Sequence, residues 1–329
     1  MNTNLSFSAP SQVETDCLVA VVLDRSENDR SKDARSKKDR GKNDKPVAAV
    51  ESGDAAVRDA AKDVIAGGEV TGKMFETTLV HRPAGLKAKS IRSFAFALPE
   101  KAIAAGDAVR SVVEGAFVGN FEPDYYKSDR KDLSIEALTI VAQGDKAALE
   151  EAMRKARVVA ESQNFTRDLV NEPSNRMTPA ILGERARKMA AEVGLKCEVH
   201  GADKLKELKM GAFWGVAQGS DEPPALIVLR YEPEGAAKDV HLGLVGKGIT
   251  FDTGGISIKP SDGMEKMKYD MAGGATMIGV MRAIALLKPK VKVTAIICAT
   301  ENMPSGKAQK PGDVQIGRAS CRERVWIPV

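Results

Sequence analysis

The chain is poor in the residue patterns that mark secreted and membrane proteins. Its 329 residues include four cysteines that lie far apart, without the close spacing of a metal site: Cys17, Cys197, Cys298 and Cys321. This usage favours a reducing cytoplasm over a disulfide framework. No apolar run approaches the roughly 18 residues that a membrane-spanning helix needs, and the N-terminus lacks the basic and apolar regions of a signal peptide. We therefore expect a cytoplasmic protein without a membrane partner.

The chain also has little excess of charge of one sign. Its net charge of +4 is too small to imply a nucleic-acid partner by itself. Residues 25–45 carry nine basic and five acidic side chains and no aliphatic residue larger than Ala34. Such a stretch cannot bury enough apolar surface to offset its ordering entropy, so we predict a solvated, disordered loop. A DNA-binding arm is the alternative, which the mixed signs and the lack of aromatic residues disfavour.

The length and the order of patterns predict two domains. Buried strands are expected at 17–24, 93–100 and 138–145. Helical patterns such as that of 55–68 lie between them, and this alternation indicates an α/β domain over residues 1–145. An amphipathic helix at 146–170 is expected to link this domain to a second one at 171–315.

The second domain shows its helix boundaries clearly. Thr178 and Pro179 suit the N-cap and first turn of a helix that ends at Gly194. Residues 271–287 form a second helical pattern with a predicted apolar stripe: Met277, Val280, Met281, Ile284 and Leu287. The near-continuous apolar run at 291–300 predicts a strand buried on both faces of a parallel sheet.

The segment "GKGITFDTGGISIKPS" at 246–261 lies where such a sheet places its ligands. A strand at 240–246 runs into Lys247, so Lys247 and Asp252 are expected just past its carboxyl end, and Asn302 just past the next strand. A phosphate-binding P-loop is disfavoured because Gly248, not Ser or Thr, follows the lysine. A dinucleotide-binding loop is disfavoured because Phe251 occupies the third glycine position.

Two readings of this segment remain open on the residues alone. Asp252 and Asp270 could bind a hard divalent ion, since such ions favour carboxylate oxygens. The segment holds no histidine, which argues against most mononuclear zinc hydrolase sites. A structural turn with incidental charges is the alternative, because lysine and aspartate are common beside glycines in loops.

The stretch "VGKGITFDTGGISIKP…MEKMKYDMAGGATMIGVMRAIA" closely resembles the metal-binding core of the leucyl aminopeptidases, the cytosol aminopeptidase family. The blocks "NEPSNRMTP", "GAFWGVAQGS" and "NMPSGKAQKPGD" resemble further blocks of that family in the same order. The resemblance is strong over about 165–314. It implies an N-terminal macro-like α/β domain and a C-terminal catalytic domain with a central mixed sheet flanked by helices, incomplete in this chain.

The resemblance also implies what the site residues do. Two divalent ions, manganese or zinc, would assist removal of N-terminal residues, leucine preferred, from peptides. Asp252 would bridge the ions, and Asp270 and the neutral amine of Lys247 would complete the more weakly held one. Lys259 would stay charged and stabilise the oxyanion of the reaction. Two further residues lie near these and are candidates for the substrate side-chain pocket, although packing is the more usual role for such residues: Met267 and Thr276.

The C-terminus departs from the family pattern. After "PGD" the family has an N-T-D-A-E-G-R segment with a second Asp, a bridging Glu and an Arg thought to hold a catalytic bicarbonate, and the printed sequence contains no such segment. Residues 316–325 resemble a translated sequencing adapter, so we predict that 316–329 is a non-native tail, the alternative being an arginine-rich tail. We expect this polypeptide to be inactive and to misfold, because its sheet would lack strands and expose an edge.

Other classes of function remain as alternatives. Family members form hexamers, so a homohexamer is expected of the complete enzyme, and this chain could be a structural subunit within such an assembly. Some relatives bind DNA, so a DNA-binding protein that uses the same scaffold is the second alternative. A mobility shift of duplex DNA that is salt-dependent and lost on deletion of 25–45 would identify that function.

Overall fold

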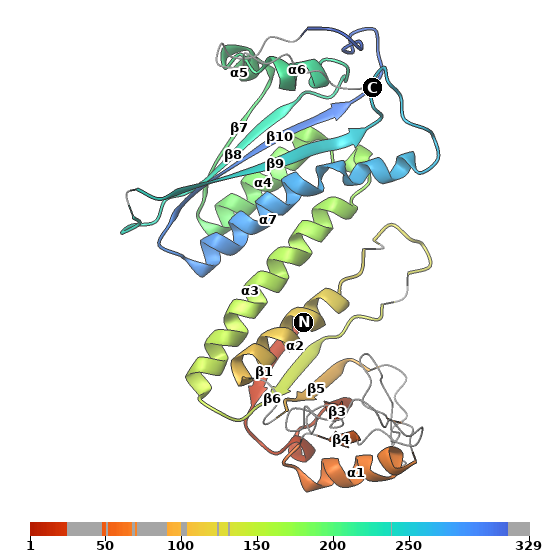
Figure 1. Ribbon diagram of the computed structural model, residues 1–329, viewed down its shortest axis with the longest axis vertical. Helices are drawn as coiled ribbons and strands as arrows, with labels where there is room; N and C mark the ends of the chain where they lie inside the picture. The colour runs from red at the N-terminus through yellow and green to blue at the C-terminus, as the bar shows by residue number, and fades with distance from the viewer. Residues whose placement is uncertain are drawn as a thin grey trace, which may run out of the picture. The chain divides into compact units, whose positions relative to one another are not determined.

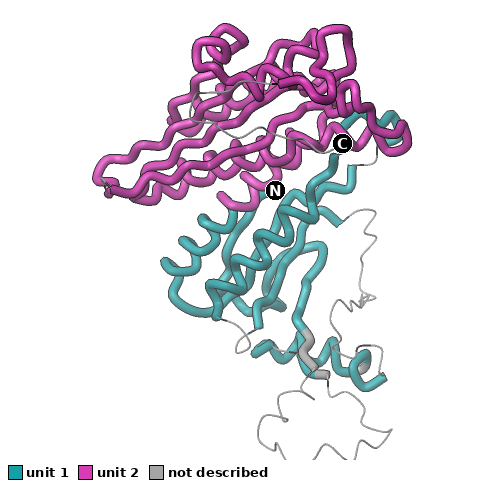
Figure 2. The backbone as a smooth tube through the Cα atoms, turned by 45° about the horizontal axis from the view of Figure 1, so that its top comes forward, with its two compact units in different colours: residues 1–157 teal, residues 158–329 magenta. Residues whose placement is uncertain are grey.

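The computed structural model divides into two compact units, residues 1–157 and 158–329, coloured separately in Figure 2. The boundary between the units falls inside α3 (Lys146–Asn171), the helix that the sequence predicts at 146–170. The predicted charged loop 25–45 and the predicted non-native tail 316–329 lie outside the described residues. The structure describes residues 1–24, 48–50, 52–67, 70, 91–99, 104–123, 125–130, 132–237 and 239–314.

The first unit is built on a parallel sheet. Its strands lie in the order β1 (Asn2–Ser6), β6 (Ala137–Val141), β5 (Ser93–Ala97), β2 (Cys17–Ala20), and each neighbouring pair is parallel. A separate antiparallel pair joins β3 (Val22–Asp24) and β4 (Ala48–Val50). The three predicted strands of the first domain are therefore present, although the first is divided into β2 and β3.

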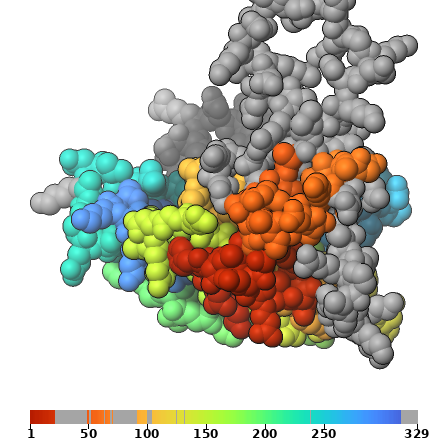
Figure 3. All heavy atoms as spheres, turned by 90° about the horizontal axis from the view of Figure 1, so that it is seen from below, coloured from red at the N-terminus to blue at the C-terminus, as the bar shows by residue number. Residues whose placement is uncertain are grey.

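Besides the first part of α3, the described residues of the first unit form the helices α1 and α2. α2 (Ala105–Gly119) buries Val109, Val113 and Phe117, which recur every fourth residue as an amphipathic helix requires. α1 (Ala55–Ala66) lies beside the short 3₁₀ turn η1 (Pro10–Gln12), as the adjacent orange and red residues of Figure 3 show. The Asp54 carboxylate connects the two by accepting a 2.7 Å hydrogen bond from the Ser11 N–H.

The second unit contains a mixed sheet with the order β7-β8-β10-β9. β7 (Lys196–His200) and β8 (Ala225–Tyr231) are antiparallel, β8 and β10 (Lys292–Asn302) are antiparallel, and β10 runs parallel to β9 (His241–Asp252). The expectation of a central mixed sheet is confirmed. The strand predicted at 291–300 is expected in a parallel sheet. This is correct for its pairing with β9 and wrong for its pairing with β8, which is antiparallel.

Helices cover both faces of this sheet (Figure 1). α4 (Pro179–Val193) and α7 (Ala272–Leu287) pack on one face, and the short helices α5 (Ala202–Glu207) and α6 (Gly211–Ala217) lie on the other. Two 3₁₀ segments, η3 (Ser174–Arg176) and η4 (Met264–Met271), precede α4 and α7.

The predicted ends of α4 are confirmed in detail. The Thr178 hydroxyl accepts a hydrogen bond from the Ile181 N–H, and Pro179 is the first helical residue. The helix ends at Gly194, whose φ of 76° lies in the left-handed region that glycine adopts without strain.

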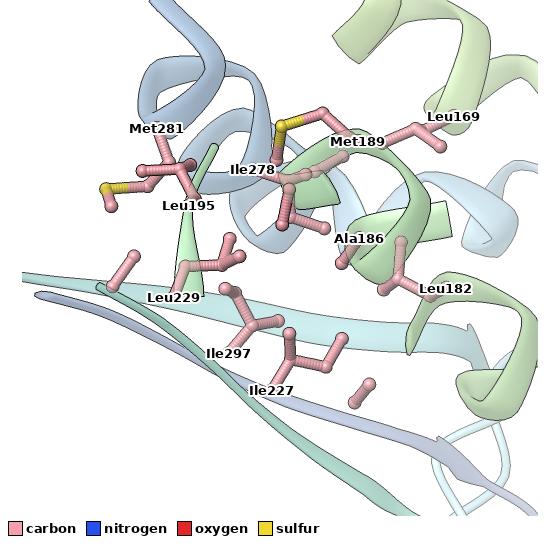
Figure 4. Close-up of a cluster of buried hydrophobic side chains, with 14 of the residues drawn as sticks. Leu169, Leu182, Ala186, Met189, Leu195, Ile227, Leu229, Ile278, Met281 and Ile297 are labelled. Carbon is pink, nitrogen blue, oxygen red and sulfur yellow. The ribbon is translucent and has the colours of Figure 1, made fainter. Parts of the chain in front are cut away.

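The main core lies between the sheet and the helices α4 and α7 (Figure 4). Ile227, Leu229 and Ile297 of the sheet meet Met189, Ile278 and Met281 of the helices, and all six are fully or almost fully buried. Leu169 from the last turn of α3 joins this cluster. Burial of side chains of this size removes them from water and stabilises the unit that carries the site.

Two predicted burial patterns are correct only in part. Of the predicted stripe of α7, Met281 is fully buried, and the half-buried Met277 and Ile284 pack against the core. The most buried face of the helix is shifted from that stripe and is made by Gly274, Ala275, Ile278, Met281 and Ala285. The reason is close helix–sheet contact, which selects small residues. β10 is not buried on both faces: its burial alternates, and Ile296 is 37% exposed.

Within the described part of the chain, one helix is long and apolar enough to cross a membrane by length and composition, which corrects the expectation that no run approaches that length. It is the continuous segment Met264–Leu287, made of η4 and α7. Buried residues of α7 belong to the core described above, as in an apolar helix of a globular protein.

Candidate metal site at the ends of β9 and β10

The candidate site forms where two parallel strands end side by side. β9 ends at Asp252 and β10 ends at Asn302, and these two residues are partners in the ladder. The predicted location is therefore confirmed, but Lys247 is not past its strand: β9 continues to Asp252, and Lys247 is one of its exposed residues.

A tight turn follows Asp252 and returns the chain to the strand ends. The Thr253 N–H and hydroxyl both donate to the Asn302 carbonyl, at 2.9 and 2.7 Å. The Lys259 N–H donates to the Thr253 carbonyl at 2.9 Å, which brings the Lys259 side chain back towards Asp252. Gly255 lies in this turn with φ of 68°, and a Cβ there would lie 2.8 Å from Asn302 Oδ1. Glycine is required by both the backbone angle and the space.

The Asp252 carboxylate is held on both oxygens. Oδ1 accepts from the Gly254 N–H at 2.9 Å and from Asn302 Nδ2 at 2.7 Å. Oδ2 accepts from Lys259 Nζ at 2.7 Å, and the Asp252 side chain is only 13% exposed. Lys259 Nζ is also 3.1 Å from Met267 Sδ.

A second pair of opposite charges lies beside the first. Lys247 Nζ is 2.8 Å from Asp270 Oδ2, at the last turn of η4. The same Asp270 oxygen is buried and makes no hydrogen bond, so its contact with Lys247 is an ion pair by distance without the geometry of a hydrogen bond. A buried carboxylate oxygen without a hydrogen bond is uncommon and indicates a functional position.

The two carboxyl groups affect each other's protonation. Burial raises the pKa of Asp270, and the nearby Asp252 carboxylate raises it further, against the opposing effect of Lys247. Burial also acts to raise the pKa of Asp252, but the hydrogen bonds from Lys259, Gly254 and Asn302 outweigh it and lower that pKa below its ordinary value. Two neighbouring carboxyls whose pKa values move in opposite directions are typical of functional sites.

The structure thus brings together five of the six predicted site residues: Lys247, Asp252, Lys259, Met267 and Asp270. Thr276 lies on the exposed side of α7, where its hydroxyl donates to the Ala272 carbonyl within the helix. The sequence predicts Asn302 near a strand end but does not mark it as a site residue. Its position at the end of a strand parallel to β9 is the signal that identifies it.

The donor set fits a hard divalent cation in part. Within the described ranges, no group of three or more His, Cys, Asp and Glu side chains could hold an ion. Asp252 and Asp270 provide two carboxylates, and Lys247 would be the third donor if its amine were neutral. The buried, unbonded Asp270 oxygen is the observation in favour of a cation here.

Known proteins are similar to this chain in sequence and fold. The family described as "Cytosol aminopeptidase family, catalytic domain" matches residues 164–321, which includes the first residues of the predicted non-native tail. Two solved structures of the bottromycin maturation enzyme BotP are similar, and the one in complex with Mn has 34% identity and a TM-score of 0.62, covering 70% of this chain and 48% of that chain.

Curated relatives are more similar in sequence. "Probable cytosol aminopeptidase" of Koribacter versatilis is 50% identical, and that of Acidobacterium capsulatum is 46% identical; each alignment covers 96% of this chain and 68% of the relative. The chain therefore spans about two thirds of the length of these relatives. At this identity and coverage, the chain belongs to the cytosol aminopeptidase family, whose members are metal-dependent exopeptidases.

Proposed function

We propose that this chain carries part of the active site of an aminopeptidase that releases N-terminal residues, leucine preferred, from peptides with the help of two divalent ions. The observation that carries the proposal is the convergence of two lysines and two carboxylates at the ends of β9 and β10. The Mn complex of BotP supports manganese as the ion, and zinc is the alternative that the family resemblance implies.

Each residue has a chemical task that follows from its surroundings. When bound, a pair of divalent ions supplies an activated water and polarises the scissile carbonyl. Asp252 and Asp270 would provide the anionic oxygens that hold the ions, and Lys247 would provide a neutral amine. The Lys259 ammonium, which contacts Asp252 Oδ2 and Met267 Sδ, would stabilise negative charge on the substrate oxygen. Met267, whose sulfur lies 3.1 Å from Lys259 Nζ, would contact the substrate side chain.

The partners and the cellular location follow from the same proposal. Peptides would be the substrates, and the complete enzyme would assemble as a homohexamer with a bicarbonate held by an arginine of the N-T-D-A-E-G-R segment. A cytoplasmic location is supported by the word cytosol in the relatives' names.

The 329-residue polypeptide by itself is proposed to be inactive, since its sequence carries Lys247, Asp252 and Asp270 but no N-T-D-A-E-G-R segment. We would join residues 1–314 to the remaining third of the Koribacter versatilis relative and assay Mn²⁺-dependent release of leucine from a leucyl anilide. The hybrid should be active and the 329-residue chain should not. Activity of the 329-residue chain would refute the inactivity, and an inactive but folded hybrid would refute the proposed function.

Lys259 provides the sharper test of mechanism. In the active hybrid, Lys259→Gln should lower kcat by about 10²–10³-fold, the usual cost of removing a donor to a developing oxyanion. Lys266→Gln is the matched control, because Lys266 is an exposed lysine of the neighbouring η4. Equal rates in the two variants would exclude the assigned role of Lys259.

A further inference from the structure

The residue that fixes the Asp252 carboxylate from outside its own loop is Asn302. It reaches this place through an irregularity in the β9–β10 ladder. Thr300 pairs with Ile249, whereas Glu301 pairs with Phe251, so one extra residue of β9 is passed over between the two pairs. Without this bulge Asn302 would stand opposite Phe251 instead of Asp252. Bulges of this kind re-aim side chains and are frequent beside active sites.

The orientation of the Asn302 amide is set by its contacts. Nδ2 donates to Asp252 Oδ1 at 2.7 Å, and a carboxylate accepts hydrogen bonds and donates none, so the nitrogen must face it. Oδ1 lies on the side of Gly255, where a Cβ would come within 2.8 Å of it. The Asn302 carbonyl meanwhile binds the Thr253 N–H and hydroxyl. Asn302 therefore holds the carboxylate and the turn behind it at the same time.

The two carboxylate oxygens of Asp252 therefore have different kinds of hydrogen-bond donor. Oδ1 is bound by two neutral donors that are fixed in place, the Gly254 N–H and the Asn302 amide. Oδ2 is bound by Lys259, whose side chain is 35% exposed and flexible. The fixed side sets the plane of the carboxylate, while the other oxygen faces a partner that can move.

We propose that Asn302 is a positioning residue, which holds the Asp252 carboxylate in the orientation needed to bind a divalent ion. This inference rests on the proposed function, since it requires Asp252 to be a metal ligand. Groups that orient metal ligands typically change metal affinity by about 10–100-fold when they are removed. A purely structural asparagine would change stability and leave the affinity for the ion unaltered.

The test is Mn²⁺ binding by the hybrid of residues 1–314 with the remaining third of the Koribacter versatilis relative, measured with MnCl₂ alone from the electron paramagnetic resonance signal of the free ion. Asn302→Ala should weaken binding about ten-fold or more. Asn302→Leu keeps most of the side-chain volume but cannot donate a hydrogen bond, and it should weaken Mn²⁺ binding to the same extent. This variant shows whether the loss in Asn302→Ala comes from the missing donor or from collapse of the site into the empty space. The melting temperature of each variant is recorded alongside.

Two further variants separate the possible outcomes. Ser220→Ala is the matched control, because the Ser220 hydroxyl donates a 2.6 Å bond to Glu301, the neighbour of Asn302 on β10, away from the turn after Asp252. It should leave the Mn²⁺ affinity unchanged. Asp252→Asn should abolish binding. If Asp252→Asn abolishes binding but both Asn302 variants bind as the wild type does, the positioning role is refuted and the metal site stands. If the wild type and Asp252→Asn bind equally, the metal site and the positioning role are refuted together.

Discussion

Substitution of Gly246 by alanine tests how closely α7 must approach β9 to build the site. A Cβ at Gly246 would lie 2.7 Å from Gly274 Cα, 2.8 Å from the Gly273 carbonyl oxygen and 2.9 Å from Met277 Cγ. Two of these neighbours are backbone atoms that cannot rotate away, so the helix must shift from the strand. Forcing an extra methyl into a packed core costs about 1–3 kcal/mol. For a unit of this size, each kcal/mol lowers the melting temperature by about 2–4 °C.

The matched control lies on the same strand. Gly243 is exposed, and a Cβ there would meet nothing within 4 Å. Gly243→Ala should change the free energy of unfolding by no more than about 0.5 kcal/mol. Urea unfolding followed by circular dichroism compares the two variants with the wild type. If Gly246→Ala unfolds at the same urea concentration as Gly243→Ala, the close helix–strand approach is not a requirement, and the reasoning fails.

Two further predictions concern local interactions. Thr178→Ala removes the side-chain acceptor of the Ile181 N–H and should destabilise the second unit by about 1 kcal/mol in urea unfolding; a loss below the error of the measurement would contradict the capping role. The Asp16 carboxylate accepts hydrogen bonds from the Arg92 and Ser93 N–H groups, and these bonds lower its pKa in the folded protein. The contribution of Asp16 to stability is therefore fully present above the unfolded-state pKa near 3.8. It is lost as the pH falls through the lower folded-state pKa. Asp16→Asn should therefore make stability less dependent on pH below about pH 4, and an acid limb as steep as that of the wild type would argue against it.

Local sequence determined the elements well where the signal is confined to a few neighbouring residues. Thr178, Pro179 and Gly194 fix both ends of α4 because N-capping, a fixed φ and the left-handed region are properties of single residues. The face that α7 buries could not be found in this way. Ala275, Ile278 and Met281 are buried because α7 lies very close to β9, whereas the other four residues of the predicted stripe are half-buried.

The sequence by itself determined the candidate residues of the site, because the types and spacing of Lys247, Asp252, Lys259 and Asp270 carry the resemblance to the family. Spacing alone could not pair them. The fold places Lys259 on Asp252 and Lys247 on Asp270, since a tight turn returns Lys259 to the strand end while η4 carries Asp270 beside the exposed Lys247. Asn302 joins them through a single bulge between two strands that lie 50 residues apart in the chain. Strand register is a property of the assembled sheet, and tertiary structure alone decides it.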